Sequence, residues 1–250
     1  MNAKWRRISG SILIVATMVF VGLLSAAACA YPGGTHFDHA RVGHDFWRNT
    51  LCDVARTVAL DGRPNPVGCA LARAAMTTLA LGLGVLFLAL PSLFDVRLRA
   101  ARLIRVLGAL TVPCAIAVVL LPTDRFSALH GLAIVLAGTL GLGTTVLAMR
   151  GLLADPRAPR LVVIAGALAL GIASADFVLY VRELAMGGPA QVAVAVLERL
   201  ATVFVLAWMA TAARALRGGV QRAREGAQDV CNPLHARRCT PLGADPTIER

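Results

Sequence analysis

Residues 8–30 read ISGSILIVATMVFVGLLSAAACA, an apolar run without a charged residue. A helix needs about 20 such residues to cross a bilayer, and the chain carries six runs of this kind. Hydrophobic residues make up 57% of the chain and the mean hydropathy is +0.69, above the range of soluble domains. The sequence therefore predicts an all-α protein, an integral membrane bundle of six transmembrane helices.

A long polar segment, residues 31–67, separates the first two apolar runs, and its Gly and Pro pairs predict an ordered loop rather than a flexible linker. Residues 216–250 are polar, Arg-rich and aperiodic, which predicts a disordered basic tail after a transmembrane domain of residues 1–215. The six predicted helices span about 8–30, 68–94, 103–121, 128–149, 161–181 and 191–213.

The distribution of charge predicts the orientation in the membrane. With the N-terminus inside, the inner segments hold 17 basic and 6 acidic residues, whereas the outer segments hold 6 of each. Because basic residues accumulate on the cytoplasmic side, both termini are expected in the cytoplasm and the loop outside. The net charge of +11 then reflects topology and contact with anionic lipid rather than nucleic-acid binding.

Four ionisable residues lie inside the predicted helices: Arg73, Asp176, Glu198 and Arg199. An unpaired charge at mid-membrane costs about 2.5–3.5 kcal/mol on insertion scales. All four fall roughly 7–11 Å below the outer surface at 1.5 Å per residue, so we expect a paired network that faces the bundle interior and contributes to ligand binding. The alternative is a purely structural network that fixes the register of the helices.

The outer loop and its surroundings add a second group of polar residues. Asp53, Asp124 and His130 are the candidate catalytic groups, and His36, His39 and His44 are weak candidates for metal ligands. The stretch HFDH lacks the general-base Glu of an HExxH motif, and the histidines have a simpler interpretation as solvated loop residues. Whether Cys52 and Cys69 form a disulfide, and whether the first helix is cleaved as a signal, stay open.

Several stretches together resemble one family. They are YPGG at residues 31–34, FWRNTLCDVART at 46–57, RPNP at 63–66, and Pro122-Thr-Asp124 followed by His130. This combination, over about residues 8–215, is similar to the bacterial multi-pass membrane family called domain of unknown function 998. The resemblance implies a six-helix membrane protein without an established activity and favours Arg48, Asn49, Asp53, Asp124 and His130 as functional positions. Cys52 and Ala55 stand where that family more often has Ser and Gly.

The leading hypothesis is a membrane protein with a polar pocket near the outer face that binds a lipid headgroup or a small polar molecule. Arg48 and Arg73 would contact an anionic group, and Asp53, Asp124 and His130 would order the pocket. The first alternative is a metal-dependent hydrolase at the outer leaflet, whose ligand pool is His36, His39, Asp53, Asp124 and His130. The second alternative is a proton-coupled transporter that uses Asp176 and Glu198.

The sequence leaves both the enzymatic status and the identity of any cofactor open. The partners it predicts are membrane lipids, with no nucleic acid and no inferable protein partner. The expected location is the bacterial plasma membrane.

Overall fold

A computed structural model describes residues 2–95, 97–187 and 192–230 of the chain. Its described part is helical, with isolated bridges but no strand. The elements are α1 (Ala3–Ala30), α2 (Leu51–Val54), α3 (Pro66–Ala89), η1 (Leu90–Ser92), α4 (Leu98–Leu120), α5 (Thr123–Ala154), α6 (Arg160–Met186) and α7 (Val192–Val230). Six helices are long and apolar enough to cross a membrane. The predicted fold class, an all-α membrane bundle of six transmembrane helices, is confirmed.

Most predicted boundaries differ from the observed helix ends by about five residues, and two of the differences have a clear physical reason. α5 begins at Thr123 rather than at 128, since one helical turn follows Pro122 before the non-helical Phe126 (φ −134°, ψ 44°) interrupts the helix. α7 continues to Val230, so residues 216–230 are helical where the sequence predicts the start of the tail. That segment contains Ala, Arg, Gln and Glu, which favour helix even where no apolar stripe is present. The remainder of the predicted tail, 231–250, lies outside the described residues.

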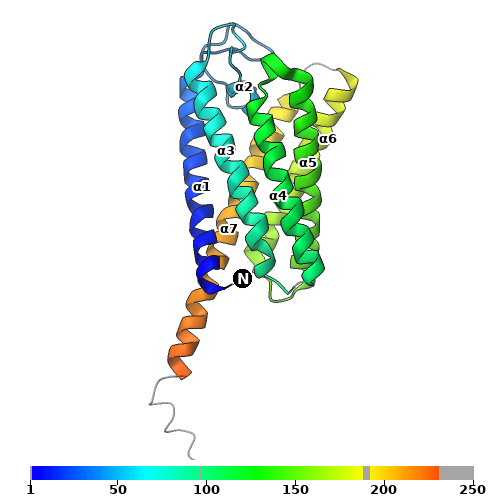
Figure 1. The fold of residues 1–250 in the computed structure, drawn as a ribbon. Helices are drawn as coiled ribbons and strands as arrows, with labels where there is room; N and C mark the ends of the chain where they lie inside the picture. Colours follow the sequence, from blue (N-terminus) through cyan, green and yellow to red (C-terminus); the bar gives the residue numbers. More distant parts are fainter. Residues whose placement is uncertain (1, 96, 188–191, 231–250) are drawn as a thin grey trace, which may run out of the picture.

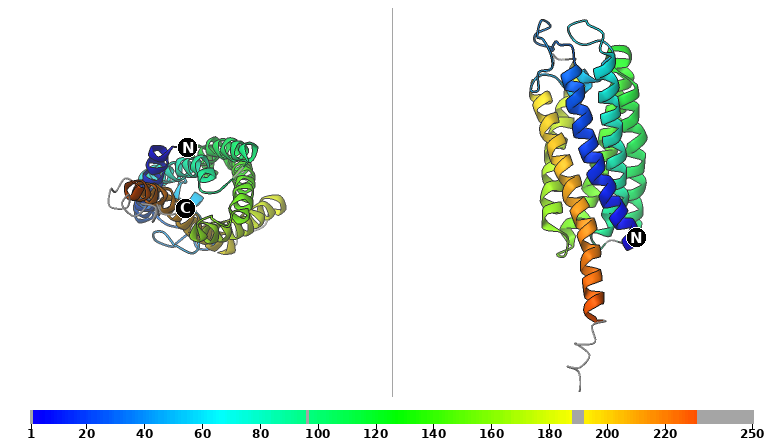
Figure 2. Two further views of the ribbon diagram at one scale, coloured as in Figure 1. Left: turned by 90° about the horizontal axis from the view of Figure 1, so that it is seen from below. Right: turned by 90° about the vertical axis from the view of Figure 1, so that its left-hand side faces the viewer.

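The helices form a ring (Figure 2). Each helix from α3 to α7 packs against the next one in the sequence, whereas α3 and α7 contact each other little. α1 packs against both of them and closes the ring at this point (Figure 1). The first helix is therefore a structural part of the bundle.

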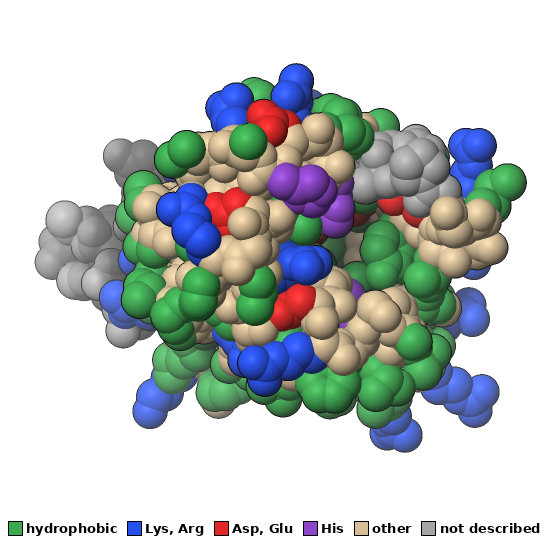
Figure 3. Space-filling model, turned by 90° about the horizontal axis from the view of Figure 1, so that it is seen from above, with side chains coloured by type: hydrophobic (Ala, Val, Ile, Leu, Met, Phe, Trp, Pro, Cys, Tyr) green, Lys and Arg blue, Asp and Glu red, His purple; other side chains and the backbone are tan. Residues whose placement is uncertain are grey.

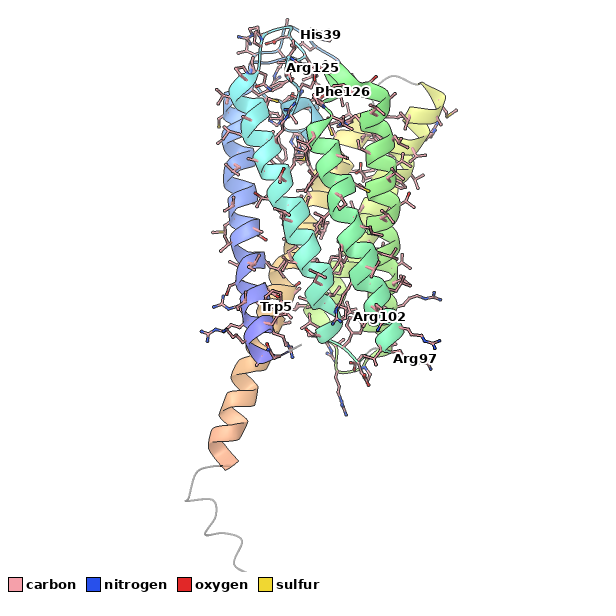
Figure 4. All side chains as sticks on the ribbon, in the orientation of Figure 1. Trp5, His39, Arg97, Arg102, Arg125 and Phe126 are labelled. Atoms are coloured by element: carbon pink, nitrogen blue, oxygen red, sulfur yellow. The ribbon has the colours of Figure 1, made fainter. Side chains whose placement is uncertain are left out.

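The two ends of the bundle differ in composition. The start of α1 and the end of α7 lie at one end, which we call the termini end, and residues 31–65 lie at the other, the loop end (Figure 1). Figure 4 places Trp5, Arg97 and Arg102 near the termini end and His39 and Arg125 at the loop end. Both termini of the membrane domain thus lie on the same side, as an even number of spans requires.

The main apolar core lies in the half of the bundle near the termini end, the termini half. In α6, the buried residues are Val162, Ala165, Gly166 and Ala169, all in the half of the helix that lies there. Glycines let helices approach closely in this core: a Cβ on Gly108 of α4 would lie 2.3 Å from Phe87 of α3. The core includes Leu13, Leu86, Phe94, Ile104, Leu152, Met209 and Leu216.

Candidate functional site

Three separate segments of the loop contact one another at the YPGG stretch. Gly34 has φ +87°, and a Cβ there would lie 2.4 Å from the Asp61 nitrogen, so the backbone conformation and the close approach both require glycine. Its N–H donates to the Arg41 carbonyl at 2.8 Å, and its own carbonyl accepts a hydrogen bond from the Asn49 side chain at 2.9 Å. Three separate segments of the loop are thereby held together at this residue.

Asn65 connects the loop to α3. Its side-chain nitrogen donates to the carbonyls of Val54 and Arg56 at 2.9 and 3.0 Å. A Cβ on Gly68 would lie 2.3 Å from the Asn65 side-chain oxygen, so this glycine gives the asparagine room. The NPVG stretch at residues 65–68 therefore starts α3 and fixes the end of the loop in one arrangement.

Two adjacent residues of α7 hold the loop over the bundle. Arg199, which is 6% exposed, donates to the Asn49 carbonyl at 2.8 Å and to the Phe46 carbonyl at 3.3 Å. Its guanidinium also lies 5.4 Å from the centre of the Phe46 ring. The Glu198 carboxylate accepts from the Leu51 N–H at 2.8 Å, which is one of the unpaired donors at the start of α2. Loop backbone thus pairs the Glu198 carboxylate and the Nε and Nη2 atoms of Arg199, whereas Arg199 Nη1 is buried without a partner within the described part of the chain.

Asp53 forms the centre of α2 and is 3% exposed. One oxygen accepts from the Thr50 N–H at 2.7 Å in a capping box, and the other lies 3.1 Å from His36 Nε2. Burial alone would raise the pKa of Asp53, but the hydrogen bonds from His36 and Thr50 outweigh it and lower that pKa. The hydrogen bond to Asp53 in turn raises the pKa of His36, against the effect of its partial burial.

His44 and Asp124 also have structural partners. Burial, together with the charge of Arg199, lowers the pKa of His44 to about 4, so this ring is neutral at physiological pH. Asp124, in the first turn of α5, accepts from the N–H of Thr57 and of Val58 and from the Thr57 hydroxyl. It joins the loop to α5 and does not line the cavity.

A cavity of about 550 Å³ lies inside the ring of helices, beneath the loop. Its lining residues come from the loop and from α3 to α7. His130 and Thr145 of α5 both line it and lie about 22 Å apart along the helix axis. The cavity is therefore elongated along the bundle axis.

The two parts of the cavity differ in polarity. We call its part at the loop end the head region, and histidine, acidic and basic side chains also lie side by side on the surface above it (Figure 3). We call the remainder the shaft, which is almost entirely apolar. The head region is lined by His36, Cys52, Asp53, Arg56, His130, Asp176, Tyr180, Glu183 and Glu198, and the shaft by residues such as Leu83, Phe87, Ala137, Ala173, Val205 and Trp208.

Two buried atoms of residues that line the head region have no hydrogen-bond partner within the described part of the chain. His130 is 4% exposed, and its Nδ1 lies 2.6 Å from the Leu121 carbonyl, whereas its Nε2 is unpaired. The second atom is Oδ1 of Asp176 on α6. Buried polar groups are nearly always paired, so these two atoms indicate a place for a ligand or for water.

The predicted network of four paired charges is not what the structure contains. None of the ion pairs among the described side chains joins Arg73, Asp176, Glu198 or Arg199 to another residue. Glu198 and Arg199 bind loop backbone instead, and Asp176 faces the cavity. Arg73 does not line the cavity. The Arg73 Nε and Asp176 Oδ1 atoms have no hydrogen-bond partner within the described part of the chain.

Two loop residues favoured by the family resemblance also lie outside the cavity lining. Arg48 is exposed. Asn49 is fully buried, and its side chain is used within the loop because it donates to Gly34 and accepts from the Asp45 N–H. Neither residue is therefore placed to contact a ligand in the cavity, and the role of Asn49 is to shape the loop.

The proposed metal ligands are separated. His39 Nδ1 lies 2.8 Å from the Leu60 carbonyl, and only His36 and Asp53 of the ligand pool contact each other. Across the described residues, no group of three or more His, Cys, Asp or Glu is arranged to hold a metal ion. Cys52 and Cys69 are free thiols rather than a disulfide. Burial raises the pKa of the Cys52 thiol well above its ordinary value, which favours the neutral thiol over the thiolate.

Sequence reasoning missed four residues that line the head region: Cys52, Arg56, Tyr180 and Glu183. The sequence does contain a signal for Tyr180 and Glu183. Asp176, Tyr180 and Glu183 are spaced i, i+4 and i+7, which places them on one face of α6. Extending the reasoning from Asp176 along its helix face would have found this stripe. Arg56 has no comparable signal, because loop conformation alone brings it to the cavity.

Comparisons with known proteins assign no family or activity to this arrangement. No family model matches the chain. No match was found among curated proteins or solved structures either. The function must therefore be argued from the cavity itself.

Proposed function

We propose that this protein binds one single-chain amphipathic molecule, with the headgroup in the head region and the hydrocarbon chain in the shaft. The observation that carries the proposal is the change of polarity along a single cavity. A volume of about 550 Å³ falls in the usual range of ligand sites. An apolar shaft gains dispersion contacts when a chain fills it and stays dry when empty.

We further propose that the loop end faces outward from a bacterial plasma membrane. The support is the excess of basic residues in the segments at the termini end, together with the family resemblance described above. The ligand would then come from the lipids of the outer leaflet.

The three tryptophans of the chain offer a direct test. Trp208 lines the shaft and is 2% exposed, whereas Trp5 and Trp47 are 49% and 53% exposed. In a Trp5→Phe, Trp47→Phe background, bulk lipid does not reach the remaining indole. A single-chain amphiphile brominated on its chain should quench Trp208 fluorescence when it occupies the shaft. Absence of quenching at saturating probe would contradict the proposal.

A matched pair of variants locates the binding. Ala173 lines the shaft, and Ala175 on the same helix is exposed toward lipid. Ala173→Phe should reduce quenching of Trp208 because the ring fills the shaft, and Ala175→Phe should leave it unchanged. Equal effects of the two substitutions would show that the probe does not enter the cavity.

Proton-coupled movement of the same ligand is the second candidate function, favoured because Asp176 and Glu198 both line the head region. Glu198 also holds the loop, so Asp176 is the residue to change. Addition of ligand to reconstituted vesicles should then cause proton uptake in the wild type and none in Asp176→Asn. Equal uptake in both would exclude this mechanism.

A further inference from the structure

The unpaired atoms of the head region define what its ligand must offer, provided that the cavity binds an amphiphile as proposed above. Both atoms noted there, His130 Nε2 and Asp176 Oδ1, belong to groups able to accept hydrogen bonds. Their partners, if supplied by a ligand, must be donors.

The tautomer of His130 follows from its neighbours. Nδ1 lies 2.6 Å from the Leu121 carbonyl and 3.1 Å from the Val118 carbonyl, both at the end of α4. A carbonyl oxygen only accepts, so Nδ1 carries the hydrogen. A second hydrogen on Nε2 would place a charge without an anionic partner in a side chain that is 4% exposed, which is costly. Nε2 therefore presents a lone pair.

Asp176 contributes from the adjacent helix. Its neighbour Tyr180, one turn further along α6, has its hydroxyl 3.6 Å from where a Cβ on Gly131 would lie. Gly131 follows His130, so α6 and α5 approach each other at this level. An ionised carboxylate accepts hydrogen bonds and donates none. The head region thus has acceptors on two neighbouring helices.

Each basic residue that lines the cavity already makes at least one hydrogen bond to protein. His36 pairs with Asp53 at 3.1 Å. Arg56 donates to the Val58 carbonyl at 3.1 Å and to the Thr123 hydroxyl at 3.5 Å. An anionic headgroup would also meet the Asp176 carboxylate. We infer that the ligand carries a hydrogen-bond donor as its headgroup, a hydroxyl or an ammonium group, rather than a phosphate or a carboxylate.

The test compares chains of one length that differ only at the head, using the full chain in phosphatidylcholine vesicles and the Trp208 quenching described above. The brominated probes are a primary alcohol, its methyl ether, the primary amine and the alkyl phosphate. The ether keeps the oxygen but loses the donor. We expect the alcohol or the amine to quench at a mole fraction roughly 5- to 150-fold lower than the ether, the range expected for one buried acceptor left unpaired. The phosphate should be no better than the ether.

A variant identifies the acceptor. In His130→Asn, the amide nitrogen keeps a donor near the position of Nδ1 while Nε2 is lost. The difference between alcohol and ether should shrink at least about fivefold in this variant. Asp176→Asn should selectively weaken the amine if an ammonium group binds the carboxylate, which separates the two possible headgroups.

The outcomes are distinguishable from failure of the proposed function. Equal quenching by the alcohol, the amine and the ether, or stronger quenching by the phosphate, would contradict the inference that the headgroup is a hydrogen-bond donor. It would still support the proposal that the cavity binds a single-chain amphiphile. Quenching by none of the probes would overturn both. The wild-type comparison does not depend on any variant, so it decides the inference even if His130→Asn fails to fold.

Discussion

In the termini half of the bundle, side chains such as Leu86, Leu152 and Met209 fill the space between the helices. In the opposite half, which we call the loop half, the same ring of helices encloses the head region and is covered by residues 31–65. The loop half is held by hydrogen bonds between side chains and loop backbone: Arg199 and Asn65 donate to loop carbonyls, and Asp53 accepts from a loop N–H. One ring of helices thus combines a densely packed half with a hollow one.

This difference in packing implies that the two halves have different roles, one in the stability of the fold and the other in ligand binding. Close packing provides most of the attraction between helices in lipid, since no hydrophobic driving force acts between them there. A cavity forgoes part of that attraction and must be tolerated by the remainder of the bundle. We therefore expect the termini half to determine the free energy of unfolding, and the loop half to determine occupancy of the cavity.

The largest effect on unfolding is expected at Leu152. This side chain is 1% exposed in the core, whereas the next residue, Leu153, is 68% exposed. Leu152→Ala should lower the free energy of unfolding by about 2–5 kcal/mol because it leaves a void among packed side chains. Leu153→Ala should change it by less than about 0.5 kcal/mol. Reversible unfolding in mixed micelles measures both. Similar values for the two would contradict a packed termini half.

A smaller and local effect is expected at Arg199. Arg199→Met leaves the Asn49 and Phe46 carbonyls without their charged donor. Hydrogen exchange of loop amides should become roughly 10- to 100-fold faster, while exchange in the termini half stays unchanged. Arg48→Met serves as control, because that exposed side chain makes no hydrogen bond within the described structure. Equal exchange in both variants would mean that Arg199 does not hold the loop.

The fold could be predicted from sequence because each membrane-spanning helix is indicated by the length and hydrophobicity of its own segment. A run of about 20 apolar residues is sufficient to predict a membrane-spanning helix. All six predicted spans are present. The end of α7 was misplaced because polarity ends a span without ending a helix.

The candidate site could be predicted only in part. Glu198 and Arg199 were found because charges inside apolar runs are costly. Their partners lie 147 and 150 residues away in a loop whose conformation no local pattern specifies. Likewise, His130 was found as a candidate, but its unpaired nitrogen becomes apparent only when the end of α4 is seen beside it. The position of each charge along its helix can be read from the sequence, whereas the rotation of the helix, which decides what the charge contacts, cannot.

Two glycines of α5, one in each half of the bundle, allow the packing of the two halves to be compared directly. The expected effects on the free energy of unfolding are of intermediate size. A Cβ on Gly151 would lie 2.2 Å from the Phe94 ring in the core, and a Cβ on Gly138 would lie 2.3 Å from the Phe177 ring, which lines the cavity. Gly151→Ala should cost about 1–3 kcal/mol of unfolding free energy, since Phe94 has no space to move. Gly138→Ala should cost less than about 1 kcal/mol because the Phe177 ring turns into the cavity.

The measurement for the glycine pair needs two readouts. Unfolding in mixed micelles gives the free energies, and Trp208 quenching by the brominated alcohol gives the occupancy. Gly138→Ala should lower occupancy with little loss of stability. The reverse pattern, with Gly151→Ala the milder change in stability, would contradict a hollow loop half.

The smallest effect concerns the dependence of loop opening on pH. Asp53 raises the pKa of His36 above its ordinary 6.5, so this pair stabilises the folded loop fully below pH 6.5 and loses the contribution as pH rises through the folded pKa of His36. The pKa of Asp53 is lowered from 3.8, so its contribution is lost only as pH falls below that value. Between these limits, His36→Gln should open the loop more often than the wild type.

The difference between wild type and His36→Gln in proteolysis of the loop, measured at each pH, isolates this pair from other titrating groups. Such isolation is necessary because His44, with a pKa of about 4, acts in the opposite direction as the pH falls below 6.5. The difference should be largest between about pH 4 and 6.5 and should diminish at higher pH. His39→Gln is the control, since His39 bonds a backbone carbonyl and no carboxylate. A difference that persists unchanged into alkaline pH would mean that His36 positions Asp53 without carrying a charge, and the loop half would then be held by neutral hydrogen bonds at this point.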